Sequence, residues 1–315
     1  MKFSVSVIIP AYNVERFIEK AIKSALLQAE VNEILVLDDG STDKTLQLIE
    51  NLQNKNSKIK IYHHNNKANK GRSASRNLGI KHAKENYVAF LDADDFYLEN
   101  RFTNDKLVFE KDLTTDGVYN AVGFHFYREA TVLEKEKLRI NTLSKKIEPE
   151  ALFDAVISSK YGDLHLNGIT VKKAVFNSTG IFNESLMVAE DSDIIIKMAL
   201  KCQLEPGIIN KPLALRGIHE TNIFTREDLY KKYRLKLYES VISWCFKNQI
   251  PLKNTDVVLN YLWVIRFREK YSLLANILYW KSLLLNNPKL IFSYLSVKYF
   301  PIIRLRQMLF PFLYR

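Results

Sequence analysis

The sequence predicts an α/β fold in which a mostly parallel sheet carries helices on both faces and is followed by a helical C-terminal region. In the first third of the chain, short runs rich in Val and Ile alternate with amphipathic stretches, as strands and crossover helices do. These runs are apolar almost throughout, which is typical of parallel strands buried on both faces. Of the 315 residues 47% are hydrophobic, enough for a sizeable core.

The predicted elements follow in chain order. The first third predicts strands at 3–9, 33–37, 59–63 and 87–91, and helices at 14–29, 44–54 and 72–84. The less regular middle third predicts a strand or hairpin at 116–127, helices at 148–158 and 188–202, a strand or short helix at 168–175, and a strand at 208–216. After His219, apolar residues recur every three or four positions, which predicts long helices. We therefore divide the chain into a domain of residues 1–220 and a C-terminal region of residues 221–315.

The carboxyl ends of the four N-terminal strands are polar. In a parallel sheet these ends meet at one edge, where α/β proteins bind ligands. One end carries Asp38 and Asp39, and another carries Asp92, Asp94 and Asp95. Such carboxylates repel one another unless a cation neutralises them. Because oxygen ligands favour Mg²⁺ or Mn²⁺, which typically bridge substrate phosphates, the sequence predicts a divalent metal site here.

Composition excludes several classes of protein. The ten glycines form neither GxGxxG nor GxxxxGK, so the two commonest glycine-rich phosphate loops are absent. Cys202 and Cys245 stand alone, which fits a reducing compartment. The first ten residues indicate a strand rather than a signal peptide, and no apolar stretch is long enough to span a bilayer. We therefore expect a cytoplasmic location.

Five ordered motifs carry a resemblance to a known family. They are SVIIPAYN at 6–13, EILVLDDGSTDKT at 33–45, NKGRSASRNLGI at 69–80, YVAFLDADD at 87–95, and TGIFNESL at 179–186 followed by EDSDIIIKMAL at 190–200. In this order they resemble the inverting, nucleotide-sugar-dependent glycosyltransferases of family 2, which have the GT-A fold. The resemblance implies a GT-A catalytic domain over residues 1–220. It also implies transfer of a sugar from a nucleotide-sugar donor, with UDP-sugar as the first expectation, to a saccharide or lipid-linked acceptor.

The resemblance places the donor at the first strand ends and the third helix. Asp39 would accept the N3–H of uracil, since a carboxylate suits an imide donor, and Pro10 and Tyr12 would lie beside the base. The alternative is that the loop around Asp39 only turns the chain and caps the next helix. Arg72 and Arg76, one helical turn apart, would reach the diphosphate or the base. The alternative for both arginines is a solvated helix face.

The resemblance also assigns the metal ligands. Asp92-Ala93-Asp94 is a DxD motif, in which Asp94 would be the main metal ligand and Asp92 would contact the ribose and be the second ligand. Asp95 could instead cap the following segment. His219 stands where many relatives have a further metal or diphosphate ligand, although a lone His after a strand is more often structural. The other histidines lack metal-ligand spacing and are expected to be structural or on the surface: His63, His64, His82, His125 and His165.

On the acceptor side, Glu190-Asp191 resembles the acidic pair of the family, and Asp191 is the predicted general base. In-line attack by an acceptor hydroxyl needs a base opposite the leaving group. Glu190 and Glu184 would lie on the acceptor side of the site. The alternative for the acidic pair is that it only complements a helix dipole. Asn183 replaces an aspartate that relatives often have, so the acceptor pocket departs from the family pattern there.

The positive charge of the chain is confined to its C-terminal part. Residues 226–315 hold 16 Lys and Arg against five acids, residues 1–225 hold 30 of each sign, and no acid follows Glu269. Ten aromatic residues follow Glu269. Basic, aromatic-rich helices suit an anionic membrane surface, so we expect a peripheral location on the inner face of the cell membrane. The alternative is that these aromatics pack inward on the catalytic domain.

Three other functions fit the sequence less well. A nucleotidyltransferase would need a glycine-rich, arginine-bearing loop after the first strand, and Pro10-Ala11-Tyr12-Asn13 is not that loop. A nucleic-acid-binding protein is suggested by charge alone, without a recognition motif, so no nucleic-acid partner is expected. A non-catalytic sugar-nucleotide-binding homologue is disfavoured because the DxD and Glu-Asp motifs are both present. The relatives known for this pattern commonly build bacterial surface polysaccharides or lipopolysaccharide.

Overall fold

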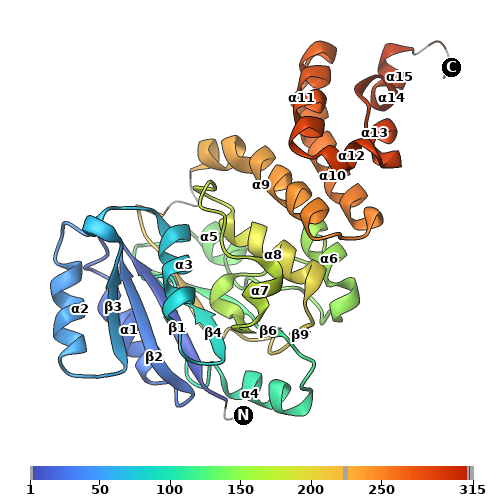
Figure 1. Ribbon diagram of the computed structural model, residues 1–315. Helices are drawn as coiled ribbons and strands as arrows, with labels where there is room; N and C mark the ends of the chain where they lie inside the picture. Colours follow the sequence, from blue (N-terminus) through green and yellow to red (C-terminus); the bar gives the residue numbers. More distant parts are fainter. Residues whose placement is uncertain (1–2, 223–225, 311, 313–315) are drawn as a thin grey trace. The chain divides into compact units, whose positions relative to one another are not determined.

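The computed structural model describes residues 3–222, 226–310 and 312, and the chain divides into two compact units, Met1–Arg226 and Glu227–Arg315 (Figure 1). The predicted boundary at residues 220 and 221 lies six residues before this division. The sequence motifs all lie in the first unit.

The first unit is built on a seven-stranded sheet with the order β3-β2-β1-β4-β8-β6-β9. Strands β3, β2, β1 and β4 run parallel to one another, β8 runs antiparallel to both β4 and β6, and β9 is parallel to β6. The mostly parallel sheet is therefore confirmed. The bounds of its strands are β1 Val5–Ala11, β2 Val31–Asp38, β3 Ile59–His63, β4 Tyr87–Phe90, β6 Gly117–Tyr119, β8 Ile169–Lys172 and β9 Leu204–Pro206.

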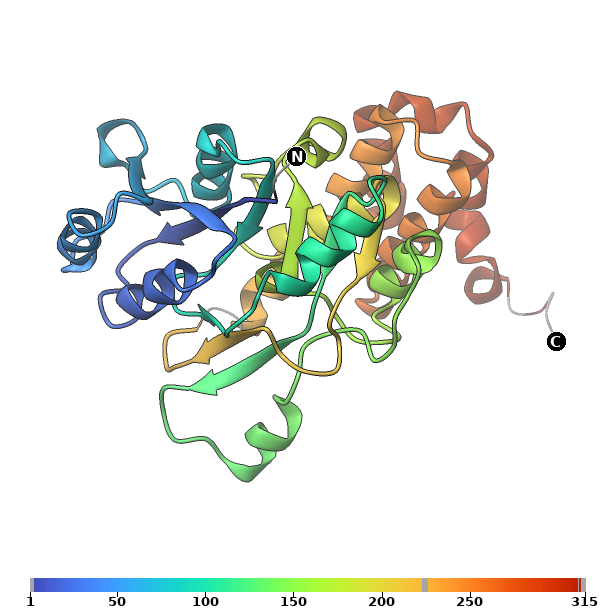
Figure 2. The same cartoon turned by 90° about the horizontal axis from the view of Figure 1, so that it is seen from below.

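Both faces of the sheet carry helices because β1 is apolar on both sides. Val7 and Ile9 belong to the core cluster that also contains Ile22 of α1. The intervening Ile8 points to the other face, where a Cβ on Gly79 of α3 would collide with it. Alternate residues of one strand thus face α1 and α3, and Figure 2 shows these helices on opposite sides of the sheet. The helices of this unit are α1 Ile18–Leu26, α2 Thr45–Gln53, α3 Arg72–His82, α4 Thr103–Lys111, α5 Val132–Lys137, α6 Pro149–Ser158, α7 Val175–Thr179 and α8 Glu190–Lys201.

A second, three-stranded sheet was not predicted. It has the order β5-β10-β7, with β5 at Phe96–Tyr97, β7 at Val122–Phe126 and β10 at Ala214–Ile218. The hairpin considered for residues 116–127 is wrong, because β6 and β7 lie in different sheets. The strand predicted at 208–216 is shifted, since β10 begins only at Ala214. Helix α1 also begins later than predicted, at Ile18 rather than at residue 14.

The second unit is helical, as predicted. Its elements are α9 Glu227–Lys247, α10 Leu252–Arg268, α11 Leu273–Asn286, α12 Pro288–Ile291, α13 Tyr294–Lys298, α14 Pro301–Arg304 and α15 Arg306–Leu309. Within the ranges that the structure covers, every helix is too short or too polar to cross a membrane. Tyr314 and Arg315, which belong to the predicted basic and aromatic tail, lie outside the described residues.

Candidate active site

The carboxyl ends of β1, β2 and β3 lie side by side. Ala11 pairs with Asp38 and Asp38 with His63 in the sheet register. The Asp38 carboxylate is buried, and its Oδ2 lies 3.3 Å from Nδ1 of His63. Its other oxygen accepts the backbone N–H of Ser41 at 3.3 Å. Asp38 therefore fixes the turn after β2 and gives His63 a structural role.

Asp39, the residue predicted to bind uracil, fastens the loop that precedes α3. Its Oδ1 accepts the N–H of Lys70 at 2.7 Å, and its Oδ2 accepts the N–H of Gly71 at 2.8 Å. Gly71 has φ +84°, a conformation that glycine adopts without steric cost. Each carboxylate oxygen keeps a further lone pair. The predicted contact with an imide N–H would use one of them.

Pro10 and Tyr12, also predicted to lie beside the base, lie at the carboxyl end of β1, Pro10 within the strand and Tyr12 directly after it. Pro10 is half-buried and pairs in register with Leu37. Tyr12 is 48% exposed, so its ring face is accessible to a base. The next residue, Asn13, accepts the N–H of Thr42 at 2.8 Å. This bond ties the loop after β1 to the loop after β2.

A buried arginine connects the DxD motif to the Glu-Asp motif. Arg76 of α3 donates from Nη2 to Asp92 at 2.6 Å and from Nη1 to Glu190 at 2.7 Å. The side chains of Arg76 and Glu190 are 2% and 1% exposed, and that of Asp92 is 27% exposed. Arg72 also contacts Glu190, with Nη2 at 3.1 Å from Oε2. Both predicted donor-binding arginines thus hold Glu190 in this structure.

The electrostatics of this network keep Asp92 ionised. Burial alone would favour a neutral carboxyl, but the guanidinium of Arg76 outweighs it and holds the pKa of Asp92 well below its usual range. At Glu190, burial outweighs the attraction of Arg72 and Arg76, so the pKa of this carboxyl is raised. Burial also disfavours the charged form of Arg76, yet Asp92 and Glu190 raise its pKa. With Arg72, which also pairs with Glu190, the two arginines balance the charges of the two carboxylates.

The structure brings together the predicted metal ligands Asp94 and His219, which are 125 residues apart. Nε2 of His219 lies 2.9 Å from Oδ2 of Asp94, while Nδ1 of the same ring lies 2.9 Å from Oγ1 of Thr221. Asn222 holds both residues, since its Nδ2 donates to Asp94 at 3.2 Å and its Oδ1 accepts the N–H of His219 at 2.6 Å. The roles of the two ring nitrogens depend on the tautomer: with the proton on Nε2, His219 donates to Asp94 and Nδ1 accepts from the Thr221 hydroxyl. Nε2 also lies 3.0 Å from Nδ2 of Asn222.

Aromatic rings support His219 on its other side. Its ring stacks on Phe17 of α1 at a centroid distance of 4.6 Å. Phe17 also contacts Tyr127, with centroids 4.7 Å apart. The Tyr127 hydroxyl is buried and has no hydrogen-bond partner among the residues that the structure covers. Burial, together with Asp95 and Asp94, raises the pKa of Tyr127 to about 12.

Asp95 has a structural role that differs from a helix cap. Its Oδ1 accepts the N–H of Gly217 in β10 at 2.7 Å, and its Oδ2 accepts the side-chain amide of Asn167. The carboxyl is buried, and burial together with Asp94 and Asp92 raises its pKa well above the usual value. Asp95 therefore anchors the DxD loop to the second sheet.

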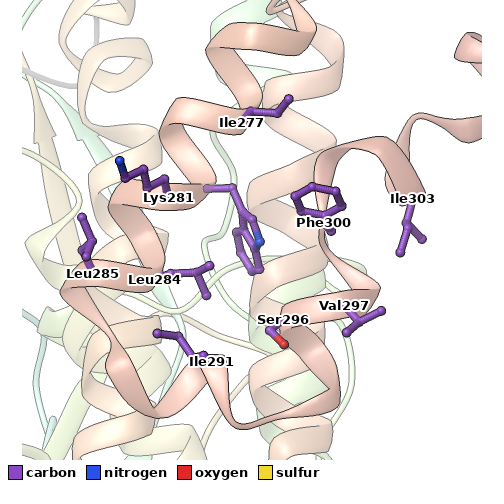
Figure 3. A pocket seen from close by; sticks show the side chains of 10 residues that line it. Ile277, Lys281, Leu284, Leu285, Ile291, Ser296, Val297, Phe300 and Ile303 are labelled. Atoms are coloured by element: carbon purple, nitrogen blue, oxygen red, sulfur yellow. The ribbon is translucent and has the colours of Figure 1, made fainter.

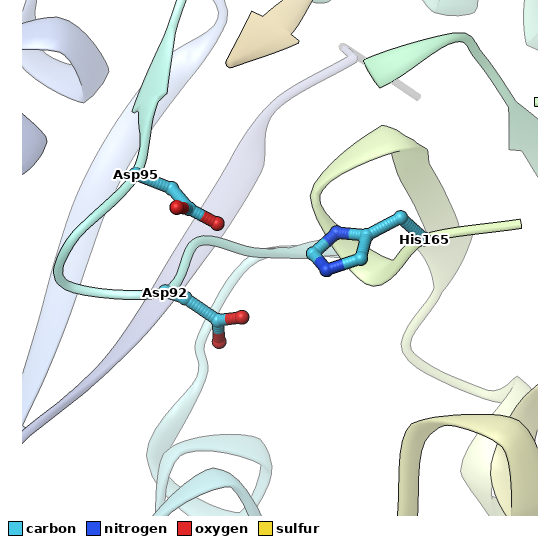
Figure 4. Close-up of side chains that lie close together, drawn as sticks. All are labelled: Asp92, Asp95 and His165. Carbon is cyan, nitrogen blue, oxygen red and sulfur yellow. The ribbon is translucent and has the colours of Figure 1, made fainter. Parts of the chain in front are cut away.

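Asp92, Asp95 and His165 form a second group with possible metal-ligand atoms, all within 4.8 Å of one another (Figure 4). Burial and Arg216 lower the pKa of His165 to about 4, so the ring is neutral. Both oxygens of Asp95 already accept hydrogen bonds. Among the described residues, the Asp92 carboxylate thus groups with Asp95 and His165 and not with Asp94 and His219. The structure brings together two of the three predicted metal ligands, Asp94 and His219.

The predicted base Asp191 lies in the first turn of α8 and is half-buried. Its Oδ1 accepts the N–H of Ser192 at 2.7 Å. The residue before the Glu-Asp pair, Ala189, is buried and has φ +63°, a costly conformation for a residue with a Cβ. The backbone is thus bent sharply where it presents Glu190 to the arginines and leaves Asp191 partly accessible.

Glu184, predicted on the acceptor side, is exposed and accepts a hydrogen bond from Nδ2 of Asn77 at 2.9 Å. Asn77 also bonds to both the N–H and the C=O of Phe182. The neighbouring Asn183 accepts the N–H of Ser185 at 3.0 Å. An amide here therefore makes the turn that an aspartate would make.

Four residues of the site were missed by the sequence analysis: Phe17, Tyr127, Asn167 and Asn222. Asn167 and Asn222 act through side-chain amides that contact residues 72 and 128 positions away. Such contacts leave no local signal in a single sequence.

Part of the chain is similar to a known protein family. Residues 6–147 match the family model described as glycosyl transferase family 2. A Haemophilus influenzae protein described as an uncharacterized glycosyltransferase is 37% identical over 145 residues, which are 46% of this chain and 54% of that protein. The minor teichoic acid biosynthesis protein GgaA of Bacillus subtilis is 26% identical over 271 residues, 82% of this chain and 56% of GgaA. The chain thus spans about half the length of these two relatives.

Solved structures show the same fold. S. aureus TarS in complex with UDP has a TM-score of 0.63 and 18% identity, and the match covers 97% of this chain and 87% of that one. At this identity the similarity concerns the fold alone. Together with the ordered motifs and the strand order, these matches show that the chain contains a family 2 glycosyltransferase domain with the GT-A fold.

Proposed function

We propose that this protein is an inverting glycosyltransferase that moves a sugar from a UDP-sugar to a saccharide or lipid-linked acceptor. One observation carries the proposal: Arg76 bonds at once to Asp92 of the DxD motif and to Glu190, the neighbour of the predicted base. Donor-side and acceptor-side motifs are thereby held at one site. Convergence of groups with distinct roles is what a transfer reaction requires.

On the donor side, Asp39, Pro10 and Tyr12 would hold the base. UDP is favoured because S. aureus TarS, which shares the fold, was solved with UDP and with UDP-GlcNAc. Asp94 and His219 would hold a divalent cation, Mn²⁺ or Mg²⁺, with Asp92 as a further ligand or ribose contact. When bound, such a cation would stabilise the negative charge on the departing diphosphate.

On the acceptor side, Asp191 would accept the proton of the attacking hydroxyl. The hydroxyl oxygen forms a bond to the anomeric carbon as the bond from that carbon to the diphosphate oxygen breaks, and the electron pair leaves with UDP. Attack opposite the leaving group inverts the configuration. Glu190 would position Asp191 through the arginines, and Glu184 would border the acceptor.

The acceptor class is proposed from the relatives. GgaA is a minor teichoic acid biosynthesis protein, and the hyaluronan synthase of Pasteurella multocida is 30% identical over 255 residues, 71% of this chain and 24% of that enzyme. Both names concern polysaccharide synthesis. We therefore propose that this protein acts in the synthesis of a bacterial surface polysaccharide, with lipopolysaccharide as the alternative that the sequence resemblance gives.

The basic C-terminal unit would bring the enzyme to the anionic inner face of the cell membrane. This unit holds 15 Lys and Arg against five acids and would be attracted to acidic lipids. A lipid-linked acceptor would be reached most readily from that location.

A donor screen tests the proposal. The full chain is incubated with Mn²⁺ and a panel of UDP- and GDP-sugars, and release of the nucleoside diphosphate is measured for the wild type, Asp94→Asn and Asp191→Asn. The expected result is release from a UDP-sugar by the wild type and loss of release in both variants. Equal release by the wild type and both variants would contradict the proposal.

A further inference from the structure

Helix α11 of the C-terminal unit is apolar on two faces. Trp280 and Leu283 are buried within the unit, whereas Leu274, Leu278 and Leu285 are 66%, 58% and 68% exposed. A helix of a water-soluble protein normally keeps a polar outer face, and a helix that is apolar all round lies in a larger core or in contact with lipid. The outer face of α11 therefore lacks the polar character that water contact favours.

A groove lies between α11 and the segment that carries α12, α13 and α14 (Figure 3). Its volume is about 500 Å³, within the range of sites that hold small ligands. The lining side chains are almost all apolar, among them Ile277, Trp280, Leu284, Ile291, Val297 and Phe300. A chain of methylene groups suits such a lining, because it has no polar atoms to leave unpaired.

One cation belongs to this lining. Lys281 is exposed and makes no ion pair within the described part of the chain. No acidic residue follows Glu269, while seven basic residues do. The groove thus combines an apolar interior with an unneutralised ammonium group. This combination is complementary to a lipid that has a hydrocarbon chain and an anionic phosphate.

The same charge argues against a second copy of the chain as the occupant. Two C-terminal units facing each other would bring together surfaces that both carry a large excess of Lys and Arg. Like charges facing each other across an interface are unfavourable. An anionic lipid removes this repulsion, whereas a second copy increases it.

We infer that this groove binds one acyl chain of an anionic membrane phospholipid, whose phosphate pairs with Lys281. The inference rests on the proposed membrane association and gives it a defined lipid site. It differs from adsorption of a basic surface, which needs no groove.

Trp280 reports directly on this groove. The chain has three tryptophans, so the full-length variant Trp244→Phe/Trp263→Phe leaves Trp280 as the sole one. Vesicles of phosphatidylglycerol and phosphatidylcholine in equal parts are prepared with and without bromine on the acyl chains, because bromine quenches indole fluorescence on close contact. We expect brominated vesicles to quench Trp280, and pure phosphatidylcholine vesicles with the same bromine content to quench it far less.

A groove variant sharpens the test. Ile291→Gln/Val297→Gln changes two lining residues that are 49% and 62% exposed, so the fold should be preserved, and the net charge is unchanged. It should lose most of the quenching. Vesicle binding without quenching of Trp280, or undiminished quenching in this variant, would overturn the inference.

Lysine variants with all three tryptophans present give a second measurement. Lys281→Gln should weaken co-sedimentation with the anionic vesicles about fivefold or more, whereas Lys289→Gln, which removes an exposed lysine outside the groove, should weaken it less. Equal effects would indicate adsorption alone and overturn the inference. Vesicle binding needs no catalysis, so Asp191→Asn should bind as the wild type does. The outcome is thus separate from that of the donor screen.

Discussion

Nη2 of Arg76 donates a hydrogen bond to Oδ1 of Asp92 at 2.6 Å. The same guanidinium reaches Glu190 at 2.7 Å with its other terminal nitrogen. Since Glu190 is almost fully buried, its charge is tolerated only because the arginines neutralise it. Arg76, which was expected to bind the sugar donor, therefore links the DxD motif to the Glu-Asp motif.

Replacing Arg76 should therefore destabilise the protein strongly. Arg76→Gln leaves Glu190 short of one buried partner, and breaking a buried pair typically costs about 3–5 kcal/mol. The free energy of unfolding in urea measures the loss. Arg72→Gln is the matched control: the Arg72 side chain is 32% exposed, so its loss should cost less. A larger cost for Arg72→Gln than for Arg76→Gln would contradict this account.

The parallel half of the fold was predictable because its signal is local. Strands β1, β2 and β4 are largely apolar, while β3 begins with Ile-Lys-Ile. The helices between these strands show their own periodicity. The second sheet was not predictable, since β5 has only two residues and β10 pairs with segments about 90 to 120 residues earlier. Asp94 and His219 were matched through ordered motifs, whereas Asn222, which holds both, carries no such signal.

Asp94→Asn and His219→Gln should weaken metal-dependent nucleotide binding. If these residues hold a divalent cation, titration with UDP in the presence of Mn²⁺ should show an affinity loss on the order of 10-fold to 100-fold in each variant, as for other changes at metal sites. UDP binding without metal should change little. Asp112→Asn is the control, since Oδ1 of Asp112 accepts the N–H and the hydroxyl of Thr114 and an amide oxygen can still do so. If Mn²⁺ increases the UDP affinity of both variants as much as that of the wild type, Asp94 and His219 are not metal ligands.

Gly217→Ala should disturb the same site through the backbone. A Cβ on Gly217 would collide with the carbonyl oxygen of Asp94 and with the ring of Tyr127. The DxD loop would have to move away from β10, which would also strain the bond from the Gly217 N–H to Asp95. We expect a loss of about 1–3 kcal/mol in unfolding free energy, as for other overpacked sites, together with weaker Mn²⁺ binding. If the Gly217→Ala variant keeps the unfolding free energy and the Mn²⁺ affinity of the wild type, the DxD loop is not packed against β10 as tightly as this contact indicates.

Asp191→Asn should abolish catalysis and leave the donor bound. The amide oxygen of an asparagine can still accept the N–H of Ser192, so the first turn of α8 should persist, but an amide cannot accept a proton from the acceptor hydroxyl. Loss of a general base typically lowers the rate by about 10²–10⁴-fold, whereas UDP affinity should equal that of the wild type. Asp154→Asn, at an exposed position of α6, controls for the loss of a carboxylate. If Asp191→Asn lowers the transfer rate no more than Asp154→Asn does, Asp191 is not the general base.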